Sequence, residues 1–511
     1  MNFTKIFRFR SFSPPVSPYK VTVRRYSKFS KLGAGWDMPN ARRAASLATI
    51  IAGVAGVGSI AYINRDRLLQ PPFPSTDQDT QTRFTTRISS NGAPYIDPEA
   101  GYPFGYLRPP SPEQVTKILN SHTWSATKGC VKGVSGYDGS QVASNGECED
   151  RYIHGKFPSP LWQQTGKHWM AWGVFDGHCG PLTAEALTQT LLPYVYHRVK
   201  SVGREVLSTN AAMSDERIQR AIQGAFEKLD DVFVKKGQEI IDSDLPFNEK
   251  VTRLQTASNG SCALLSLFDP DSRKLHVACT GDSRAVLGRE MSDGNWETVP
   301  LSVDQGGRNE AEQERIRKAH PEEEDGIVQK GRVLGLATAR AFGDAHWKWT
   351  SEMQLDARQR FLTDYLSPYD ATKYKTPPYI TAKPEVTTTE LKSGQRAFMI
   401  MASDGLWDTM SSEQAVDLVG RWVAWKDKGS KEPILPEKKD FGKFDWSPFY
   451  RSGWKLAPEG ITVQDNKASV HLTRNALGGG NQSLISGLLA FRPPYSRYSR
   501  DDITVQVVFF N

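Results

Sequence analysis

Acidic residues recur in this sequence at points where predicted β-strands end or begin. Asp176 follows the apolar run WMAWGVF, Asp404 follows AFMIMAS, and Asp501 lies just before ITVQVVFF. Taken singly, each aspartate is typical of a turn or a cap, because Asp is common where a strand ends. Several carboxylates gathered in one cleft, however, repel one another, and their pKa values rise unless a cation neutralises them. The recurrence of these acids therefore favours a metal site.

Three further acids lie beside predicted strands: Glu149 and Asp150 in ECEDRY, and Asp282 in CTGDSRAVLG. Carboxylate oxygens are hard ligands, which magnesium and manganese prefer, whereas zinc favours Cys and His. The five cysteines form no CxxC pair and are odd in number, so they predict neither a zinc ribbon nor a complete disulfide framework. We expect the cysteines to be buried or free thiols, and the acids to bind Mg²⁺ or Mn²⁺.

Short apolar runs rich in Val, Ile, Leu and Phe predict the strands that would hold these acids. They cover Trp169–Phe175, Ser261–Phe268, Lys274–Thr280, Ala397–Ala402 and Ile503–Phe510. Apolar residues recur every three to four positions from Ile218 to Phe233, which predicts a helix. Ser411 and Gln414 resemble a capping box that opens a second helix. The short gaps between consecutive strands favour antiparallel sheets covered by helices.

The charge of this chain is unevenly distributed. The net charge is +7, but residues 1–43 hold ten Lys or Arg and one acid, so they carry +9 and the remainder about −2. Because residues 44–511 have no surplus of basic residues, their charge gives no reason to expect nucleic-acid binding. The basic segment is rich in Arg, contains Ser and is nearly free of acids, which is typical of a mitochondrial transit peptide. A disordered basic arm on a cytosolic protein is the alternative.

Two further N-terminal segments follow. Residues 44–63 (AASLATIIAGVAGVGSIAYI) contain no charge, and about 20 apolar residues suffice to span a bilayer. We therefore predict a single membrane helix, with a cleaved targeting extension as the alternative. Residues 64–115 are crowded with Pro, Gly, Thr and Asp, which disfavours regular structure and indicates a linker. Residues 116–511 would form the catalytic domain.

Seven short motifs stand in order along the chain: CEDRY, FDGHCG, NGSCALL, GDSRAVL, RAFGD, ASDGLWD and RDDITV. The series resembles that of the metal-dependent type 2C (PPM) serine/threonine protein phosphatases, over residues 115–511. Within that family, LSVDQGGRNEAEQERIRKAHP, RAFGDAHWKW, TPPYITAKPEV, HLTRNALG and YSRDDITV look most like the mitochondrial pyruvate dehydrogenase phosphatases. The mitochondrial interpretation of residues 1–43 agrees with this resemblance.

The resemblance implies an α+β fold, a four-layer αββα sandwich of two mainly antiparallel sheets flanked by helices, with a two-metal site at one edge. Asp176 would bridge two Mg²⁺ or Mn²⁺ ions, and Glu149 and the carbonyl group of Gly177 would complete their coordination. Two metals can turn a bridging water into a nucleophile and stabilise the charge of a phosphoryl displacement. The implied reaction is hydrolysis of phosphoserine and phosphothreonine in a protein.

The same resemblance assigns the remaining acids. Asp404 and Asp501 would hold one of the metals, and Asp150 would act through a water molecule. Asp282 matches the position of a possible third, weaker metal. His178 matches the family's proposed general acid, which would protonate the departing Ser or Thr alkoxide. A role for His178 in orienting metal-bound water is equally open.

One position departs from the family's pattern. Where most members carry an Arg that binds phosphate, four residues before Glu149, this chain has Asn145. The pyruvate dehydrogenase phosphatases look similar in this respect. Phosphate binding would therefore depend on the metals. Asp502 stands where many relatives have Asn, and we assign it no role.

The implied protein substrate is the E1 component of pyruvate dehydrogenase, and the implied location is mitochondrial. A membrane helix would place the chain at the inner membrane, with the matrix and the intermembrane-space side both open. Two other classes compete with this interpretation. An inactive phosphatase-like binding protein would have lost ligands, whereas every expected carboxylate is present. A nuclease would need a basic groove, for which a body at about −2 offers no net charge.

Overall fold

The computed structural model describes residues 109–511 apart from 145, 210–212, 324–325, 362–374, 430, 439, 443–453, 492 and 494. The predicted transit peptide (1–43), the predicted membrane helix (44–63) and the predicted linker up to residue 108 lie outside the described residues. In the part of the chain that is described, no helix is both long and apolar enough to cross a membrane.

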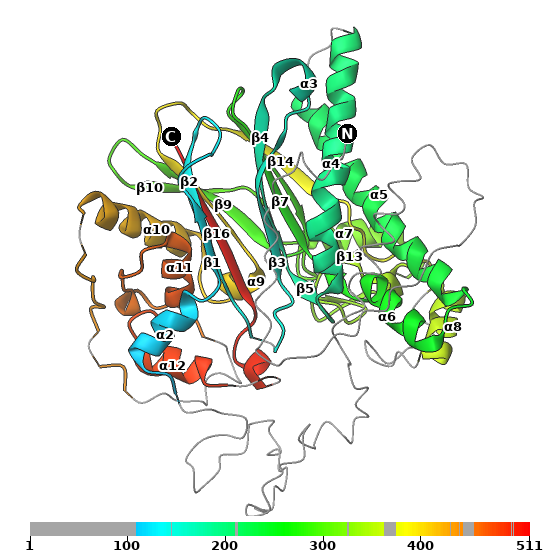
Figure 1. Ribbon diagram of the computed structural model, residues 1–511. Coiled ribbons are helices and arrows are strands. Elements are labelled where there is room, and N and C mark those ends of the chain that lie inside the picture. The colour runs from blue at the N-terminus through cyan, green and yellow to red at the C-terminus, as the bar shows by residue number, and fades with distance from the viewer. Residues whose placement is uncertain are drawn as a thin grey trace, which may run out of the picture. The chain divides into compact units, whose positions relative to one another are not determined.

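Two antiparallel sheets face each other at the centre (Figure 1). The six-stranded sheet has the order β1 (Thr123–Ala126), β2 (Val134–Val142), β16 (Ile503–Phe510), β15 (Ala397–Ala402), β9 (Arg284–Glu290), β10 (Trp296–Pro300). The five-stranded sheet has the order β14 (Glu385–Glu390), β8 (Lys274–Thr280), β7 (Ala263–Asp269), β4 (His168–Phe175), β3 (Arg151–Pro158). The C-terminal strand therefore lies in the middle of a sheet.

Side chains alternate between two cores along each buried strand, because successive residues of a strand point to opposite faces. In β15, Met399 and Met401 belong to the core between the sheets, whereas Phe398 and Ile400 pack under helices. β4 follows the same rule, with Trp172 between the sheets. Both faces of each sheet are thus covered.

The helices form two outer layers. α4 (Leu182–Thr209) and α5 (Asp215–Ile241) cover the five-stranded sheet. The six-stranded sheet is covered by α2 (Pro112–Leu119), α10 (Ser412–Asp427), α11 (Ala468–Ala476) and α12 (Gln482–Leu489). Figure 1 shows the two groups of helices on opposite sides of the paired sheets. The predicted four-layer αββα sandwich is confirmed.

Shorter elements complete the domain. The remaining helices are α3 (Trp162–Thr165), α6 (Phe247–Ser258), α7 (Glu310–Ala319), α8 (Ser351–Phe361), α9 (Asp404–Trp407) and the 3₁₀ helices η2 (Ala345–Trp347), η4 (Pro458–Gly460) and η5 (Tyr495–Tyr498). Two small sheets pair β13 (Phe342–Gly343) with β6 (Gly260–Ser261) and β5 (Gly177–His178), and β11 (Val328–Gln329) with β12 (Arg332–Val333).

Most predicted elements are present. Three predicted strands have the bounds observed for β8, β15 and β16, and the helix predicted around residues 218–233 is the longer α5. The capping box also forms: Ser411 Oγ accepts from the N–H of Gln414 (3.2 Å), whose side chain accepts from the N–H of Ser411 (2.9 Å). All five cysteines are free.

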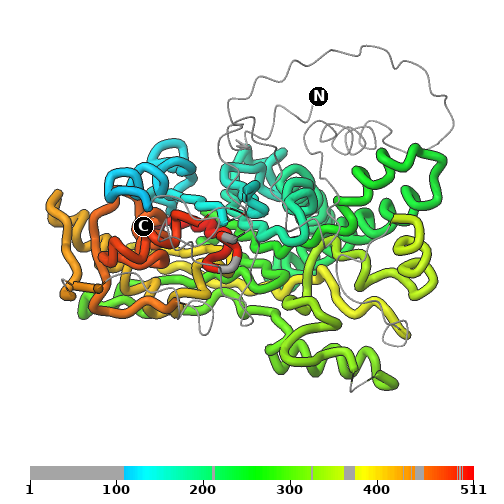
Figure 2. Tube along the Cα trace, turned by 90° about the horizontal axis from the view of Figure 1, so that it is seen from below, coloured from blue at the N-terminus to red at the C-terminus, as the bar shows by residue number. Residues whose placement is uncertain are grey.

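α2 begins inside the segment whose composition indicated a linker. Ser111 caps this helix by accepting a hydrogen bond from the N–H of Gln114 (3.3 Å). Pro112 suits the first helical position, where its missing N–H costs nothing. α2 lies against α11 and α12 from the C-terminal part of the chain, which Figure 2 shows as blue beside orange and red. Regular structure therefore begins before the predicted domain boundary at residue 116.

Candidate metal centre

The predicted acids lie at one end of the sandwich, because antiparallel pairing brings the ends of neighbouring strands together. Phe175, the last residue of β4, pairs with Arg151, the first residue of β3. Ala402, the last residue of β15, pairs with Arg284, the first residue of β9. Residues 281–283 connect β8 in one sheet to β9 in the other. The residues just outside these strand ends include Asp150, Asp176, Asp282 and Asp404.

Asp176, Asp282 and Asp404 form the middle of the site, which we call the acidic centre. Each offers a carboxylate oxygen, and these oxygens lie within 4.8 Å of one another. Cys262 donates its thiol proton to Asp282 Oδ1 (3.2 Å), and burial raises the pKa of this thiol well above its ordinary value. The cysteine is therefore a donor and not a thiolate ligand. Oxygen-only donors of this kind fit a hard divalent cation such as Mg²⁺ or Mn²⁺.

Asp150 and Asp501 lie beside the acidic centre. Asp150 is buried, and its Oδ2 accepts a 2.7 Å hydrogen bond from the hydroxyl group of Ser403. Burial, and then the charges of the other carboxylates, raise the pKa of Asp176 well above its ordinary value; these carboxylates are Asp404, Asp150, Asp501 and Asp282. The structure thus brings together five of the predicted aspartates.

Burial and mutual repulsion raise the carboxyl pKa values around the acidic centre. Burial raises the pKa of Glu149 to about 7 and that of Asp150 to about 8, and the charge of Asp502 adds to both shifts. For Asp501, burial outweighs the nearby Arg497 and raises the pKa to about 6. Because protons and cations compete for the same oxygens, cation binding here should depend on pH.

We expect the metal-free protein to lose thermal stability as the pH rises from about 7 to about 8.5. In this range folded Glu149 and Asp150 still hold protons, whereas unfolded carboxyl groups, with pKa values near 4, have released theirs. A folded state that binds more protons than the unfolded state becomes less stable as the pH rises, here by a few degrees of Tm. Scanning calorimetry with a chelator measures this decline.

Saturating Mn²⁺ should reduce the decline, to which His178 with its raised pKa also contributes, and raise Tm more at the upper pH than at the lower. The chosen window avoids three buried histidines whose pKa burial lowers to about 4: His276, His346 and His471. Above about pH 7 the unfolded histidines have released most of their protons, because the ordinary pKa of His is about 6.5, so their remaining effect on the pH dependence of stability is small. A metal-free Tm that stays level or rises across the window would contradict the raised carboxyl pKa values.

Gly177, the first residue of β5, lies against the backbone of Glu149. A Cβ at position 177 would collide with the carbonyl oxygen of Glu149, so only glycine permits this approach. The half-buried carboxylate of Glu149 accepts a hydrogen bond from the backbone N–H of Gly180. Both residues therefore lie near the acidic centre, and coordination by the carbonyl group of Gly177 stays a prediction.

His178 is paired with Asp344, a residue to which the sequence analysis assigned no role. His178 Nε2 lies 2.7 Å from Asp344 Oδ2. Gly260 makes room for the pair, because a Cβ at position 260 would overlap both side chains. Burial lowers the pKa of His178, but the charge of Asp344 and the hydrogen bond to it outweigh this effect and raise the pKa overall, with further contributions from Asp282 and Glu149. His178 can therefore hold a proton beside the acidic centre.

The backbone around Asp344 fixes the position of its fully buried side chain. Asp344 has a left-handed conformation (φ 44°, ψ 41°), which Asp tolerates better than most residues. Its N–H donates to the carbonyl group of Asn259 (2.9 Å). The N–H of Gly343 donates to Asp230 (3.0 Å), which also forms a buried ion pair with Lys348 (2.6 Å). The pattern RAFGD contains Asp344, so a sequence signal for this residue existed.

Asp502 holds the backbone of the segment that leads to Glu149. Its Oδ1 accepts from the N–H (2.5 Å) and the hydroxyl group (2.9 Å) of Ser144, and its Oδ2 accepts from the N–H of Glu149 (2.7 Å). Both carboxylate oxygens are thus used by protein donors. Asp502 positions Glu149, whereas the neighbouring Asp501 lies beside the acidic centre.

Asn145 lies outside the described residues, so its predicted part in phosphate binding stays a prediction.

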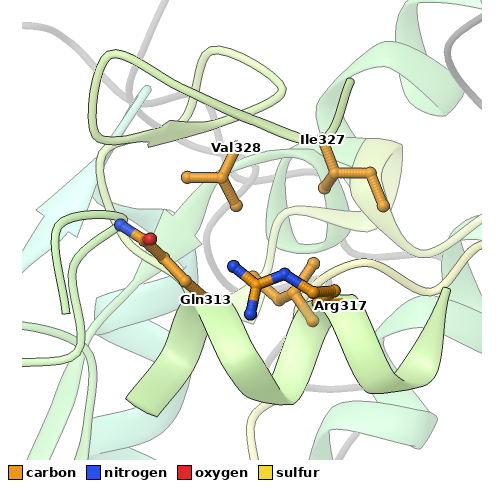
Figure 3. A pocket seen from close by; sticks show the side chains of 5 residues that line it. Gln313, Arg317, Ile327 and Val328 are labelled. Atoms are coloured by element: carbon orange, nitrogen blue, oxygen red, sulfur yellow. The ribbon is translucent and has the colours of Figure 1, made fainter. Parts of the chain in front are cut away.

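A small pocket formed by α7 and the start of β11 is lined by Gln313, Ile316, Arg317, Ile327 and Val328 (Figure 3). None of these residues belongs to the acidic centre, and we assign the pocket no function.

Comparison with known proteins identifies the family. Residues 145–443, more than half of the chain, match the sequence profile of the family described as "Protein phosphatase 2C". This chain belongs to that family. The match contains the whole acidic centre, and the resemblance seen in the motifs is confirmed. Phosphatases 2C are serine/threonine protein phosphatases that depend on Mg²⁺ or Mn²⁺, which agrees with the oxygen-only donors found here.

Individual phosphatase relatives cover most of the chain. A protein phosphatase 2C homolog of Schizosaccharomyces pombe is 38% identical, covering 79% of this chain and 86% of the relative. The "[Pyruvate dehydrogenase [acetyl-transferring]]-phosphatase 1, mitochondrial" of Saccharomyces cerevisiae is 35% identical, over 74% of this chain and 69% of the relative. The corresponding phosphatase 2 of Homo sapiens is 31% identical, over 78% and 83%. The predicted similarity to pyruvate dehydrogenase phosphatases is thus confirmed.

Proposed function

We propose that this phosphatase 2C hydrolyses phosphoserine and phosphothreonine in a protein, with water as the nucleophile, at the acidic centre. The observation that supports this proposal most directly is the approach of Asp176, Asp282 and Asp404 to within 4.8 Å. Carboxylates held so close together repel one another unless divalent cations neutralise them. Membership of the phosphatase 2C family supports the same reaction.

In this proposal the chain's part is to hold and orient the cations. The residues that would bind them, directly or through water, are Glu149, Asp150, Asp176, Gly177, Asp282, Asp404 and Asp501. When bound, Mg²⁺ or Mn²⁺ supplies a deprotonated water and neutralises the charge of the phosphate group. Ser403 keeps Asp150 in place through its 2.7 Å hydrogen bond, and Asp502 keeps Glu149 in place through the backbone.

His178 would hold the proton that the leaving group takes. Hydrolysis forms a bond between the water oxygen and phosphorus and breaks the bond from phosphorus to the Ser or Thr oxygen, which leaves as an alkoxide unless it is protonated. A protonated imidazole carries hydrogen on both nitrogens. Asp344 accepts the Nε2–H, so the Nδ1–H remains for transfer. Asp344 would therefore act by positioning His178.

We propose the phosphorylated E1 component of pyruvate dehydrogenase as the substrate, which the names of the yeast and human relatives support. The purified full-length protein with Mn²⁺ should release phosphate from phosphorylated E1. Its kcat/KM should exceed that for a peptide containing the same phosphoserine by at least about 10-fold, since contacts outside the metal site must supply the discrimination. Equal values for both substrates would argue against E1. No release from any phosphoserine substrate would refute the phosphatase reaction.

A mitochondrial location is proposed from the composition of residues 1–43 and is supported by the names of the relatives. The membrane helix at residues 44–63 and the inner membrane stay predictions. Full-length protein in isolated mitochondria should resist extraction with alkaline carbonate, and deletion of residues 44–63 should release it. Intact full-length protein in the carbonate supernatant would contradict the anchor.

A further inference from the structure

Arg497 lies at the rim of the acidic centre, on the short helix η5. Its Nη2 is 2.5 Å from Asp501 Oδ2, and 53% of its side chain is exposed to solvent. Burial lowers the pKa of Arg497, but the charges of Asp501, Asp404 and Asp176 outweigh this effect and raise it. The guanidinium therefore lies within the field of the acidic centre while remaining open to solvent.

The loop that carries Arg497 is anchored on both sides of it. The buried hydroxyl group of Ser496 donates to the carbonyl group of Ser144. The guanidinium of Arg500 donates to the carbonyl groups of Leu488 (2.7 Å) and Ala143 (3.0 Å). This loop is thus tied to the segment that precedes Glu149, and Arg497 is held next to the acidic centre by fixed neighbours.

Other arginines adjacent in sequence to the site have their donors engaged. Arg151 donates to Glu185 (2.6 Å) and to backbone carbonyl groups. Arg284 forms a two-point contact with Asp304, with distances of 2.8 and 2.5 Å. Arg500 donates hydrogen bonds to the two backbone carbonyl groups described above. Arg497, by contrast, uses Nη2 for Asp501 and has further N–H donors in the same planar group.

We propose that Arg497 binds the phosphate group of the substrate, which rests on the proposed function of the acidic centre. A guanidinium matches the spacing of two phosphate oxygens and can donate two parallel hydrogen bonds to them. Position 145, where most family members carry a phosphate-binding Arg, is an uncharged Asn in this chain. With Arg497 in this role, a protein side chain would bind the phosphate group in addition to the metals.

The test is the affinity of the full-length, Mg²⁺-loaded protein for inorganic phosphate, measured by titration calorimetry. Arg497→Ala should raise the Kd for phosphate by at least about 10-fold, because hydrogen bonds from a charged group are among the stronger ones. Arg497→Lys keeps one charge but loses the planar pair of donors, so its Kd should lie between those of the wild type and the Ala variant. The affinity for Mg²⁺ should not fall in the Ala variant, because the positive charge of Arg497 beside Asp501 opposes cation binding rather than assisting it.

Arg421→Ala is the matched control, because Arg421 forms an ion pair with Asp417 at the same sequence spacing and its side chain is 52% exposed. Its phosphate Kd should equal that of the wild type. An unchanged phosphate Kd in Arg497→Ala, or a fall in Mg²⁺ affinity that accounts for the whole effect, would overturn the inference. Calorimetry measures phosphate binding without turnover, so the two proposals can fail separately. If the wild type hydrolyses phosphoserine and Arg497→Ala binds inorganic phosphate as tightly as the wild type, only the role of Arg497 is refuted. A protein that binds phosphate through Arg497 without hydrolysing phosphoserine refutes only the phosphatase reaction.

Discussion

Asp404→Asn is expected to lower turnover by at least about 100-fold at saturating Mn²⁺, with the fold retained. Asp404 belongs to the acidic centre, and an amide in its place removes one of the negative charges that would hold the cations. Metal ions contribute several kcal/mol to such a reaction, and each 1.36 kcal/mol corresponds to about tenfold in rate. The measurement is kcat on a phosphoserine protein over a range of Mn²⁺ concentrations. More than about a tenth of the wild-type rate would contradict a role for Asp404 in metal binding.

The same substitution should not destabilise the metal-free protein. Burial, and then repulsion from Asp282 and Asp501, raise the pKa of Asp404 well above its ordinary value. A neutral amide of the same shape removes this repulsion, so the metal-free Tm should rise or stay level, whereas the increase in Tm on adding Mn²⁺ should shrink. Asp417→Asn, on the exposed side of α10, is the control that should change neither quantity. A fall in metal-free Tm would indicate a structural role.

The buried strands could be predicted because both of their faces are covered, so they are continuous apolar runs. β15 and β16 are examples. β2 was not predicted, because its polar side chains find partners far along the chain. Asp138 in β2 accepts hydrogen bonds from the N–H groups of Ala468 (3.2 Å) and Ser469 (2.8 Å) at the start of α11, about 330 residues later. No local pattern contains such a partner.

The gathering of acids at the acidic centre could be predicted from the strand ends, but the side chains that support these acids could not. Asp501 and Asp502 are adjacent and chemically identical, and only packing decides that Asp502 binds the backbone of Ser144 and Glu149. Residues next to each other at a strand end point to opposite sides, and the sequence does not say which side is the site. Arg497 was missed for the same reason, since its distance from the acidic centre depends on how its loop is anchored.

The pair of His178 and Asp344 shows a third limit. The two residues are 166 positions apart and meet through the small sheet of β13, β6 and β5. The motifs containing both residues were recognised, yet their contact depends on Gly260, which has no side chain to block it. Sequence patterns identify residues that can do chemistry, whereas contacts between residues so far apart in the sequence follow only from the completed fold.

His178→Gln is expected to lower kcat by at least about 100-fold on a phosphoserine protein and far less on p-nitrophenyl phosphate. A serine alkoxide is a poor leaving group, and a positioned acid typically contributes about 10² to 10⁴ in rate. The aryl ester leaves as a stabilised phenolate and needs little help. The comparison of kcat on the two substrates isolates protonation of the leaving group, because both use the same nucleophile. His197→Gln, on the exposed side of α4, is the matched control.

Asp344→Asn tests whether the partner of His178 acts through the pKa of that histidine. Asp344 helps to raise the pKa of His178, so removing its charge should lower that pKa. Because the acid must be protonated, the alkaline limb of the pH–rate profile on phosphoserine should move to lower pH, while the profile on the aryl ester stays in place. Mn²⁺ affinity should be nearly unchanged in both variants. If His178→Gln reduced both substrates equally, or weakened Mn²⁺ binding strongly, His178 would instead orient the metal-bound water, and the leaving group would take its proton from solvent.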